Sequence, residues 1–120
     1  MINDIKPKRY DLEERTEKFA KEIIAFVKEV PRSIANNEIV KQLVRSAGSI
    51  GANYIEANEA LSKKDFLHRI KICRKEAKES RYWLNLIEVA ERQEHRRQQL
   101  RVEATELMKI FGAIVVKTEG

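Results

Sequence analysis

Apolar residues recur along the central part of the chain with the period of α-helices. The run from Arg45 to Ile87 predicts two long helices, because its apolar positions are spaced by three or four residues. A very short turn at Leu61–Lys63 separates them, and Ser62 followed by Asp65 is typical of a capped helix start. Helices joined by so short a turn run antiparallel, as neighbours.

Three chemically different faces follow the second of these helices. Its core face has small and apolar residues at alternating steps of four and three: Phe66, Ile70, Cys73, Ala77, Ser80, Leu84 and Ile87. A neighbouring face, about 100° round the helix, mixes apolar side chains with carboxylates: Ile72, Glu76, Glu79, Trp83, Leu86 and Ala90. A third face is polar: Lys71, Lys75, Lys78 and Tyr82. We interpret these as core, contact surface and solvent face.

The preceding helix has an unusually broad apolar side. One stripe comprises Ile39, Leu43, Ala47, Ile50, Tyr54, Ala57 and Leu61, and a second comprises Val40, Val44, Gly51 and Ile55. Gly48 and Gly51 each cost about 1 kcal/mol in a helix interior relative to alanine. Close approach of another helix backbone is the compensation we expect. The alternative is simple burial of this helix within its own bundle.

Two further amphipathic helices flank this central pair. After an N-terminal arm (residues 1–10), the first starts at Asp11 and runs to Pro31, and Asn36 or Asn37 is expected to cap the next helix. We place the last connection at Glu91–Arg97, because Leu100 begins a new apolar stripe that must fold back on the core. Residues 1–120 therefore predict a single all-α domain, an antiparallel up-down-up-down four-helix bundle.

Positive charge is concentrated in the second half of the chain. The net charge is +5, yet residues 1–60 are balanced, so the whole surplus lies in residues 61–120. A basic helix face in this half of the chain would attract polyanions such as nucleic acids, although lysines on an ordinary solvent-exposed helix face give the same sequence pattern. The candidate nucleic-acid-binding residues are Lys63, Lys64, Lys71, Lys75, Lys78 and Arg81.

The sequence shows no catalytic or metal-binding pattern. His68 and His95 belong to no metal motif, and the glycines of G-S-I-G at residues 48–51 lack the lysine of a phosphate-binding loop. Cys73 lies on the core face, where a buried thiol acts as a small apolar side chain. We therefore expect a non-enzymatic protein without metal or cofactor. No apolar run is long enough to span a membrane, and no signal sequence is evident, so a cytoplasmic location is expected.

The central segment resembles the four helix bundle protein family, also called the 23S rRNA intervening-sequence proteins. The hallmark of that family is an R-x-A-x-S-I-x-x-N run followed by an acidic helix. It is matched here by Arg45, Ala47, Ser49, Ile50, Asn53, Glu56, Glu76, Glu79 and Leu84. The resemblance implies a homopentamer. The family is also similar to the basic accessory proteins of diversity-generating retroelements, which implies a reverse transcriptase or other nucleic-acid enzyme as a partner.

These observations lead to two functional hypotheses. The first is a homo-oligomer, by resemblance a pentamer, that presents basic side chains to RNA or DNA. The second is a protein–protein interaction scaffold, in which the lysines serve solubility alone. In both, the expected subunit contact is the carboxylate-bearing face and its neighbours: Arg45, Asn53, Glu56, Ile72, Glu76, Glu79 and Trp83.

Overall fold

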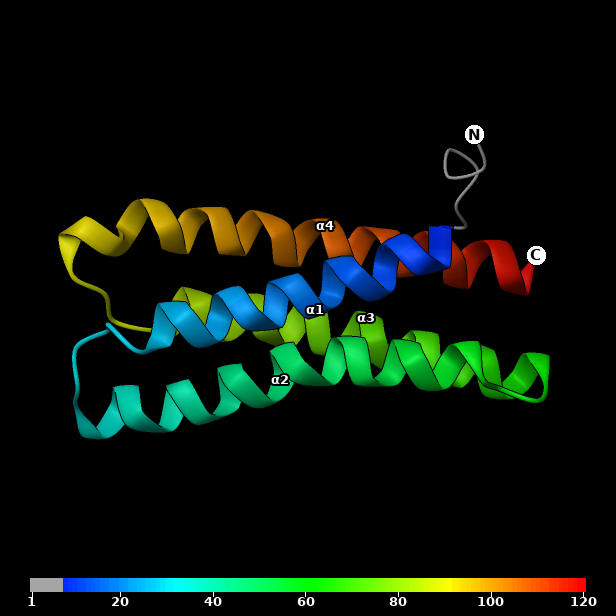
Figure 1. Ribbon diagram of the computed structural model, residues 1–120, viewed down its shortest axis with the longest axis horizontal. Helices are drawn as coiled ribbons and strands as arrows, with labels where there is room; N and C mark the ends of the chain where they lie inside the picture. Colours follow the sequence, from blue (N-terminus) through cyan, green and yellow to red (C-terminus); the bar gives the residue numbers. More distant parts are fainter. Residues whose placement is uncertain (1–7) are drawn as a thin grey trace.

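The computed structural model describes the backbone of residues 8–120 and the side chains of residues 12–120. In chain order the elements are α1 (Lys8–Val27), α2 (Ile34–Asn58), α3 (Lys63–Leu86), the short 3-10 helix η2 (Glu91–Gln93) and α4 (Glu94–Glu119). Consecutive helices lie side by side and reverse direction at each connection (Figure 1). The predicted all-α four-helix bundle is confirmed. None of the described helices is long and apolar enough to cross a bilayer.

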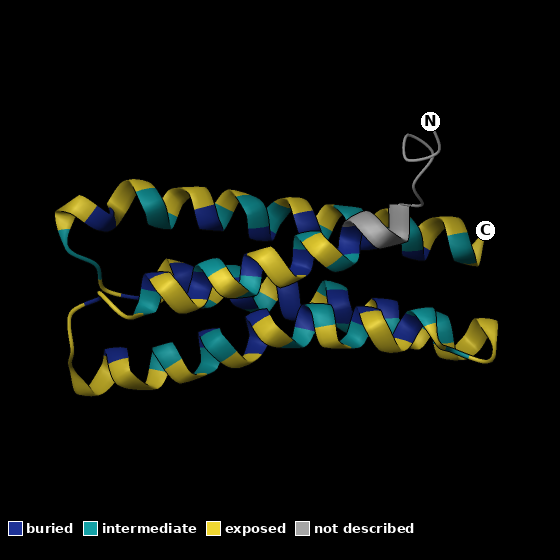
Figure 2. Ribbon diagram, viewed as in Figure 1, coloured by how far each residue is buried: buried dark blue, intermediate teal, exposed yellow. Residues whose placement is uncertain are grey.

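The core is a continuous apolar interior to which all four long helices contribute. The predicted core residues of α3 from Ile70 to Ile87 are buried, and only Phe66, at its start, is partly exposed. Buried positions form one inward stripe along each helix (Figure 2). The largest fully buried side chains include Phe19, Leu43, Ile50, Leu107 and Phe111. Packing of these stripes is the principal source of stability, because most helical stability in proteins comes from burial of an amphipathic face.

The turn between α2 and α3 follows the expected cap. The Ser62 side chain accepts a hydrogen bond from the backbone N–H of Asp65, at 3.0 Å. However, α2 ends at Asn58, so Leu61 lies in the turn and not on the core stripe predicted for it. Its side chain is 97% exposed.

The first two helices begin earlier than the sequence suggested. Helix α1 starts at Lys8, so residues 8–10 of the predicted arm are helical, and residues 1–7 lie outside the described part. Helix α1 also ends at Val27, before Pro31. The cap of α2 is Ser33, whose hydroxyl oxygen accepts from the N–H of Asn36 at 3.0 Å. The predicted caps Asn36 and Asn37 were wrong, because both already lie within the first turn.

Asn36 instead joins two connections at one end of the bundle. Its carboxamide nitrogen donates to the carbonyls of Pro31 (2.8 Å) and Glu88 (2.9 Å), and its oxygen accepts from the N–H of Glu88 (2.9 Å). The side chain is 2% exposed, so these three bonds satisfy a buried amide. One residue thus fixes the α1–α2 link against the segment that follows α3.

The break before α4 exists, but it lies earlier than predicted. Helix α3 ends at Leu86, Ile87 has an extended backbone, and the next helical turn starts at Glu91. Arg97 of α4 reaches back to the end of α3 and donates to the carbonyls of Ile87 (2.8 Å) and Leu84 (3.5 Å). A cation at this position satisfies carbonyls that the helix leaves free and complements the helix dipole. The polar residues 91–97 therefore form η2 and the first turn of α4, and the non-helical link to α3 precedes them.

Candidate nucleic-acid interface and the α2–α3 polar contacts

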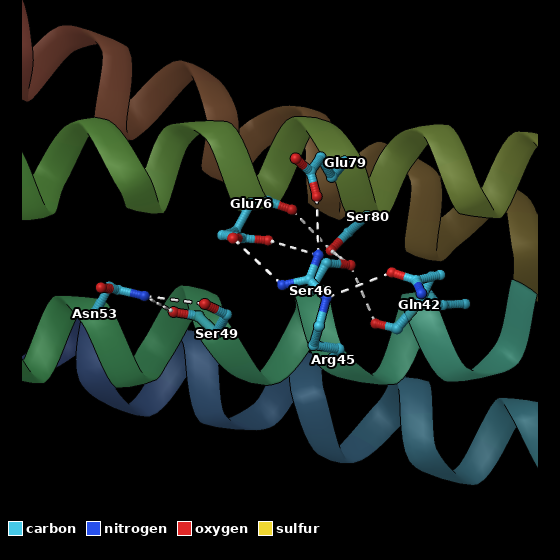
Figure 3. Close-up of polar contacts among 9 residues, drawn as sticks. Gln42, Arg45, Ser46, Ser49, Asn53, Glu76, Glu79 and Ser80 are labelled. Carbon is cyan, nitrogen blue, oxygen red and sulfur yellow. Dashed lines mark hydrogen bonds and ion pairs between the residues drawn. The ribbon is translucent and has the colours of Figure 1, made fainter.

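Arg45 of α2 binds Glu76 and Glu79, the two carboxylates on the face of α3 that also contains Trp83 (Figure 3). Its Nη2 lies 2.9 Å from Glu79 Oε1 and 3.4 Å from Glu76 Oε1, and its Nη1 lies 3.5 Å from Glu76 Oε2. The hydrogen bond to Glu76 is the main cause that raises the pKa of Arg45. Glu76 is only 7% exposed, so its charge requires this partner. Glu76 and Glu79, which the sequence assigned to the expected subunit contact, are therefore paired within one chain.

Further polar contacts join α2 and α3 on the same side. Ser46 and Ser80 are buried, and their hydroxyl oxygens lie 2.8 Å apart. Arg69 Nη1 donates to Asn53 Oδ1 at 2.9 Å, while the Asn53 amide donates to the hydroxyl and carbonyl oxygens of Ser49. The Ser46–Ser80 and Arg69–Asn53 bonds fix the register of α2 against α3, and all of these contacts lie within one chain.

The seven predicted interface residues lie on these two helices, but they differ in environment. Arg45, Glu76, Glu79 and Asn53 are engaged by the contacts just described. Glu56 is exposed and Ile72 is half-buried. Trp83 is half-buried, with its indole nitrogen buried and without a hydrogen-bond partner among the described residues, and the Tyr82 ring lies edge-on at 5.1 Å. Assembly through these seven residues stays a prediction. Glu76 and Glu79 do not need a second subunit as a partner, because Arg45 of the same chain pairs with both.

The two glycines of α2 also differ. A Cβ atom built on Gly51 would lie 2.9 Å from Thr16 Oγ1, so close approach of α1 accounts for this glycine. The predicted compensation is therefore found at Gly51, within the bundle. At Gly48 a Cβ atom would meet nothing within 4 Å in the described chain. Gly48 is exposed, and no contact with the described residues compensates for its low helix propensity.

Most charges in the central part of α3 are segregated between its two sides, although the cation Arg69 also contacts α2. Glu76 and Glu79 face α2 and pair with Arg45, whereas three of the cations approach α4. Lys71 Nζ lies 3.2 Å from Glu119, the Arg74 side chain passes Gly112, and Arg81 Nη1 lies 3.5 Å from Thr105 Oγ1. Of the candidate nucleic-acid-binding residues, Arg81 is half-buried and the lysines are exposed: Lys63, Lys64, Lys71, Lys75 and Lys78.

A groove between α3 and α4 contains a cation that the sequence did not single out. Arg101 of α4 lines it together with Arg81 of α3, and the other lining residues are Asn85, Gln98, Val102, Thr105 and Glu106. Arg101 Nη1 donates to Asn85 Oδ1 at 2.8 Å. Only the register of α3 against α4 brings these arginines together, and nothing in the spacing of the two helices along the sequence indicates it.

Within residues 12–120, no group of three or more His, Cys, Asp and Glu side chains is arranged to hold a metal ion. Cys73 is fully buried, and its thiol lies 3.4 Å from the carbonyl oxygen of Ile50. Burial raises the pKa of Cys73 to about 12, which disfavours the nucleophilic thiolate.

Comparison with known proteins places this fold in a family. No curated protein is significantly similar to the chain. A solved structure from Bacteroides thetaiotaomicron VPI-5482, described as a protein with unknown function from the S23 ribosomal protein family, has a similar fold, with a TM-score of 0.73. The two sequences are 30% identical, and the match covers 91% of this chain and 98% of the other. The profile described as 23S rRNA-intervening sequence protein matches residues 8–113. The chain belongs to the 23S rRNA-intervening sequence protein family.

Proposed function

We propose that this protein is a non-enzymatic, oligomeric helical bundle that binds the sugar–phosphate backbone of RNA or DNA through α3. The observation that supports this most directly is the segregation of charge on that helix. Its two central carboxylates are paired with Arg45 on the α2 side. Lys75 and Lys78 have no ion pair among the described residues, so their charges are available to an external anion.

The spacing of the exposed lysines suits a chain of phosphates. Lys71, Lys75 and Lys78 are each about one helical turn apart, so their attachment points recur about every 4.5–6 Å along the helix axis. Lysine binds phosphate as a point charge and releases condensed counterions from the nucleic acid. Binding of this kind does not depend on base sequence and weakens steeply with salt.

Assembly is the second part of the proposal. We assign the subunit contact to the α2–α3 side, where Gly48 presents bare backbone and Trp83 is only half-buried. An open glycine in a helix interior costs stability in an isolated chain, and a helix of another copy packed on it would offset that cost. The family resemblance favours a homopentamer. A ring would repeat the basic face of α3 and raise a weak affinity through multivalency.

A gel-shift titration tests the binding. We expect wild-type protein to retard a mixed RNA and a duplex DNA probe at low salt, with affinity that falls linearly in a log–log plot against salt. Exchanging Lys71, Lys75 and Lys78 for Glu should abolish the shift. The matched control exchanges Lys18, Lys21 and Lys41 for Glu, which changes net charge equally on α1 and α2 and should retain most of the binding. If both variants lose binding equally, net charge alone would explain the loss, and the assignment of the binding surface to α3 would be wrong.

Light scattering on a sizing column tests the assembly. Wild-type protein should elute as a multiple of the 14.0 kDa chain. Gly48→Leu should lower that multiple without unfolding the chain, because the added side chain meets open space in the monomer. Ala25→Leu, at a position of α1 that is also exposed, is the control. A wild-type monomer would refute assembly, and a Gly48→Leu protein of unchanged mass would refute its placement.

A protein-interaction scaffold is the alternative. It is supported by exposed apolar side chains beside the α2–α3 side: Tyr82 is 55% exposed and Leu86 is 48% exposed. A partner such as a reverse transcriptase or another nucleic-acid enzyme would then supply the contact with nucleic acid. An oligomer that gives no gel shift even at low salt would favour this function over the first.

A further inference from the structure

We infer that the α3–α4 groove around Arg81 and Arg101 is a phosphate-binding site that anchors the nucleic-acid backbone. This inference rests on the proposed function and extends it. The anchoring contact then comes from two arginines on different helices, Arg81 on α3 and Arg101 on α4. The exposed lysines then add general attraction along the strand, while the arginine pair fixes one phosphate.

Both arginines are held in place by neutral groups. Arg101 Nη1 donates to Asn85 Oδ1 at 2.8 Å, and its Nη2 donates to Gln98 Oε1. Arg81 Nη1 lies 3.5 Å from Thr105 Oγ1, a longer and weaker contact. An amide or hydroxyl oxygen orients a guanidinium without neutralising its charge. The two side chains are therefore oriented and still carry their full positive charge.

Most other arginines of the described chain have a different environment, although Arg32, Arg69 and Arg74 also lack a carboxylate partner. Ion pairs with carboxylates engage five of them: Arg15, Arg45, Arg92, Arg96 and Arg97. Arg81 and Arg101 have no carboxylate oxygen within 4.0 Å among the described residues. Glu106 also lines the groove, so one carboxylate is present against two guanidinium groups. The local balance is positive where the two helices meet.

The chemistry of the groove selects a phosphate. A guanidinium presents paired N–H donors that match phosphate oxygens, and two such groups from opposite walls can bind one phosphate together. The neighbouring cations Lys78 and Arg74 lie one and two turns back from Arg81 along α3, so an adjoining phosphate of the same strand meets further positive charge. Val102 is the only apolar lining residue, and no aromatic ring lines the groove. The site therefore recognises the backbone and not the bases.

Fluorescence anisotropy with a labelled 20-nucleotide oligothymidine tests the inference. The informative variant is Arg81→Gln/Arg101→Gln. The matched control is Arg92→Gln/Arg96→Gln, which removes the same charge from arginines paired with Glu29 and Glu22. We expect the first to weaken binding about tenfold or more at low salt. It should also reduce the slope of log affinity against log salt by about 0.7, the loss of one phosphate contact from a single strand.

The control should retain the wild-type slope. Arg81→Lys keeps the charge without the planar donors, so it should keep that slope and bind with intermediate affinity. Circular dichroism of each variant checks that the fold is retained.

The possible failures are distinguishable. If Arg81→Gln/Arg101→Gln keeps the wild-type slope while the triple lysine variant loses binding, the anchoring site is wrong and the proposed function stands. If the wild-type protein does not bind the oligonucleotide at low salt, the proposed function fails, and the anchoring site fails with it. Equal weakening in the glutamine variant and its matched control also overturns the inference, because net charge alone would then explain the loss.

Discussion

Replacing Gly51 with alanine should destabilise the bundle, although alanine is the better helix former. The new methyl group would lie 2.9 Å from Thr16 Oγ1 and 3.3 Å from Thr16 Cβ. Thr16 is 1% exposed, and its hydroxyl donates to the carbonyl of Leu12 at 2.8 Å, so this side chain has little freedom to move. Either that hydrogen bond breaks or α1 shifts away from α2.

The magnitude follows from two opposing effects. Alanine gains about 1 kcal/mol of helix propensity over glycine. Overpacking a well-filled contact costs about 1–3 kcal/mol. The net expectation is a loss of about 0–2 kcal/mol. Gly112→Ala is the matched control, because its methyl group would lie 3.7 Å from the Arg74 side chain, an ordinary contact. That variant should gain about 1 kcal/mol, so the two should differ by about 1–3 kcal/mol.

Urea unfolding followed by circular dichroism at one fixed protein concentration measures both variants. Thr16→Ala removes the nearest atom, so Thr16→Ala/Gly51→Ala should recover stability, with a coupling energy of about 1–2 kcal/mol in a double-mutant cycle. A Gly51→Ala protein as stable as Gly112→Ala, or a cycle without coupling, would refute the packing of α1 on Gly51. Close helix approach would then not explain this glycine.

Three further variants or conditions test other contacts. Arg97→Met should cost about 1–2 kcal/mol by uncapping the end of α3, with a correspondingly lower melting temperature, whereas Arg96→Met should change little. Arg45→Met should destabilise the fold by about 2 kcal/mol because Glu76 is then buried without a partner, and Arg45→Met/Glu76→Met should recover most of this in urea unfolding. Folding raises the pKa of the Cys73 thiol from 9.0 to about 12. Between these values the thiol ionises in the unfolded chain and stays protonated in the folded one. Unfolding free energy should therefore fall from pH 9 to 12, and more steeply than in Cys73→Ala.

Helix number, type and core faces could be predicted from the sequence because they depend on local periodicity. The stripe from Ile70 to Ile87 is buried as expected, and Ser62 caps α3 as expected. Boundaries were less accurate, because several residue types satisfy the same local rule. Ser33 and Asn36 are both good caps, and the choice between them depends on Glu88, 52 residues away from Asn36.

Contacts between helices could not be predicted, because they depend on register. From the sequence, Arg45, Glu76 and Glu79 were expected to contact another subunit, whereas the structure pairs them within one chain. Arg101 was missed because its role depends on which turn of α4 lies opposite Arg81. Such information becomes available only when two helices are placed against each other.

The Asn36 carboxamide has a consequence for how the two ends of the molecule tolerate change in chain length. Since it holds two connections together, an extra residue in either of them would displace a buried amide as well as the backbone. The connection at the opposite end is the short turn around the exposed Leu61 (Figure 1). Peptide tags, cleavage sites or new termini from circular permutation should therefore be accepted at that turn and rejected beside Pro31 or Glu88.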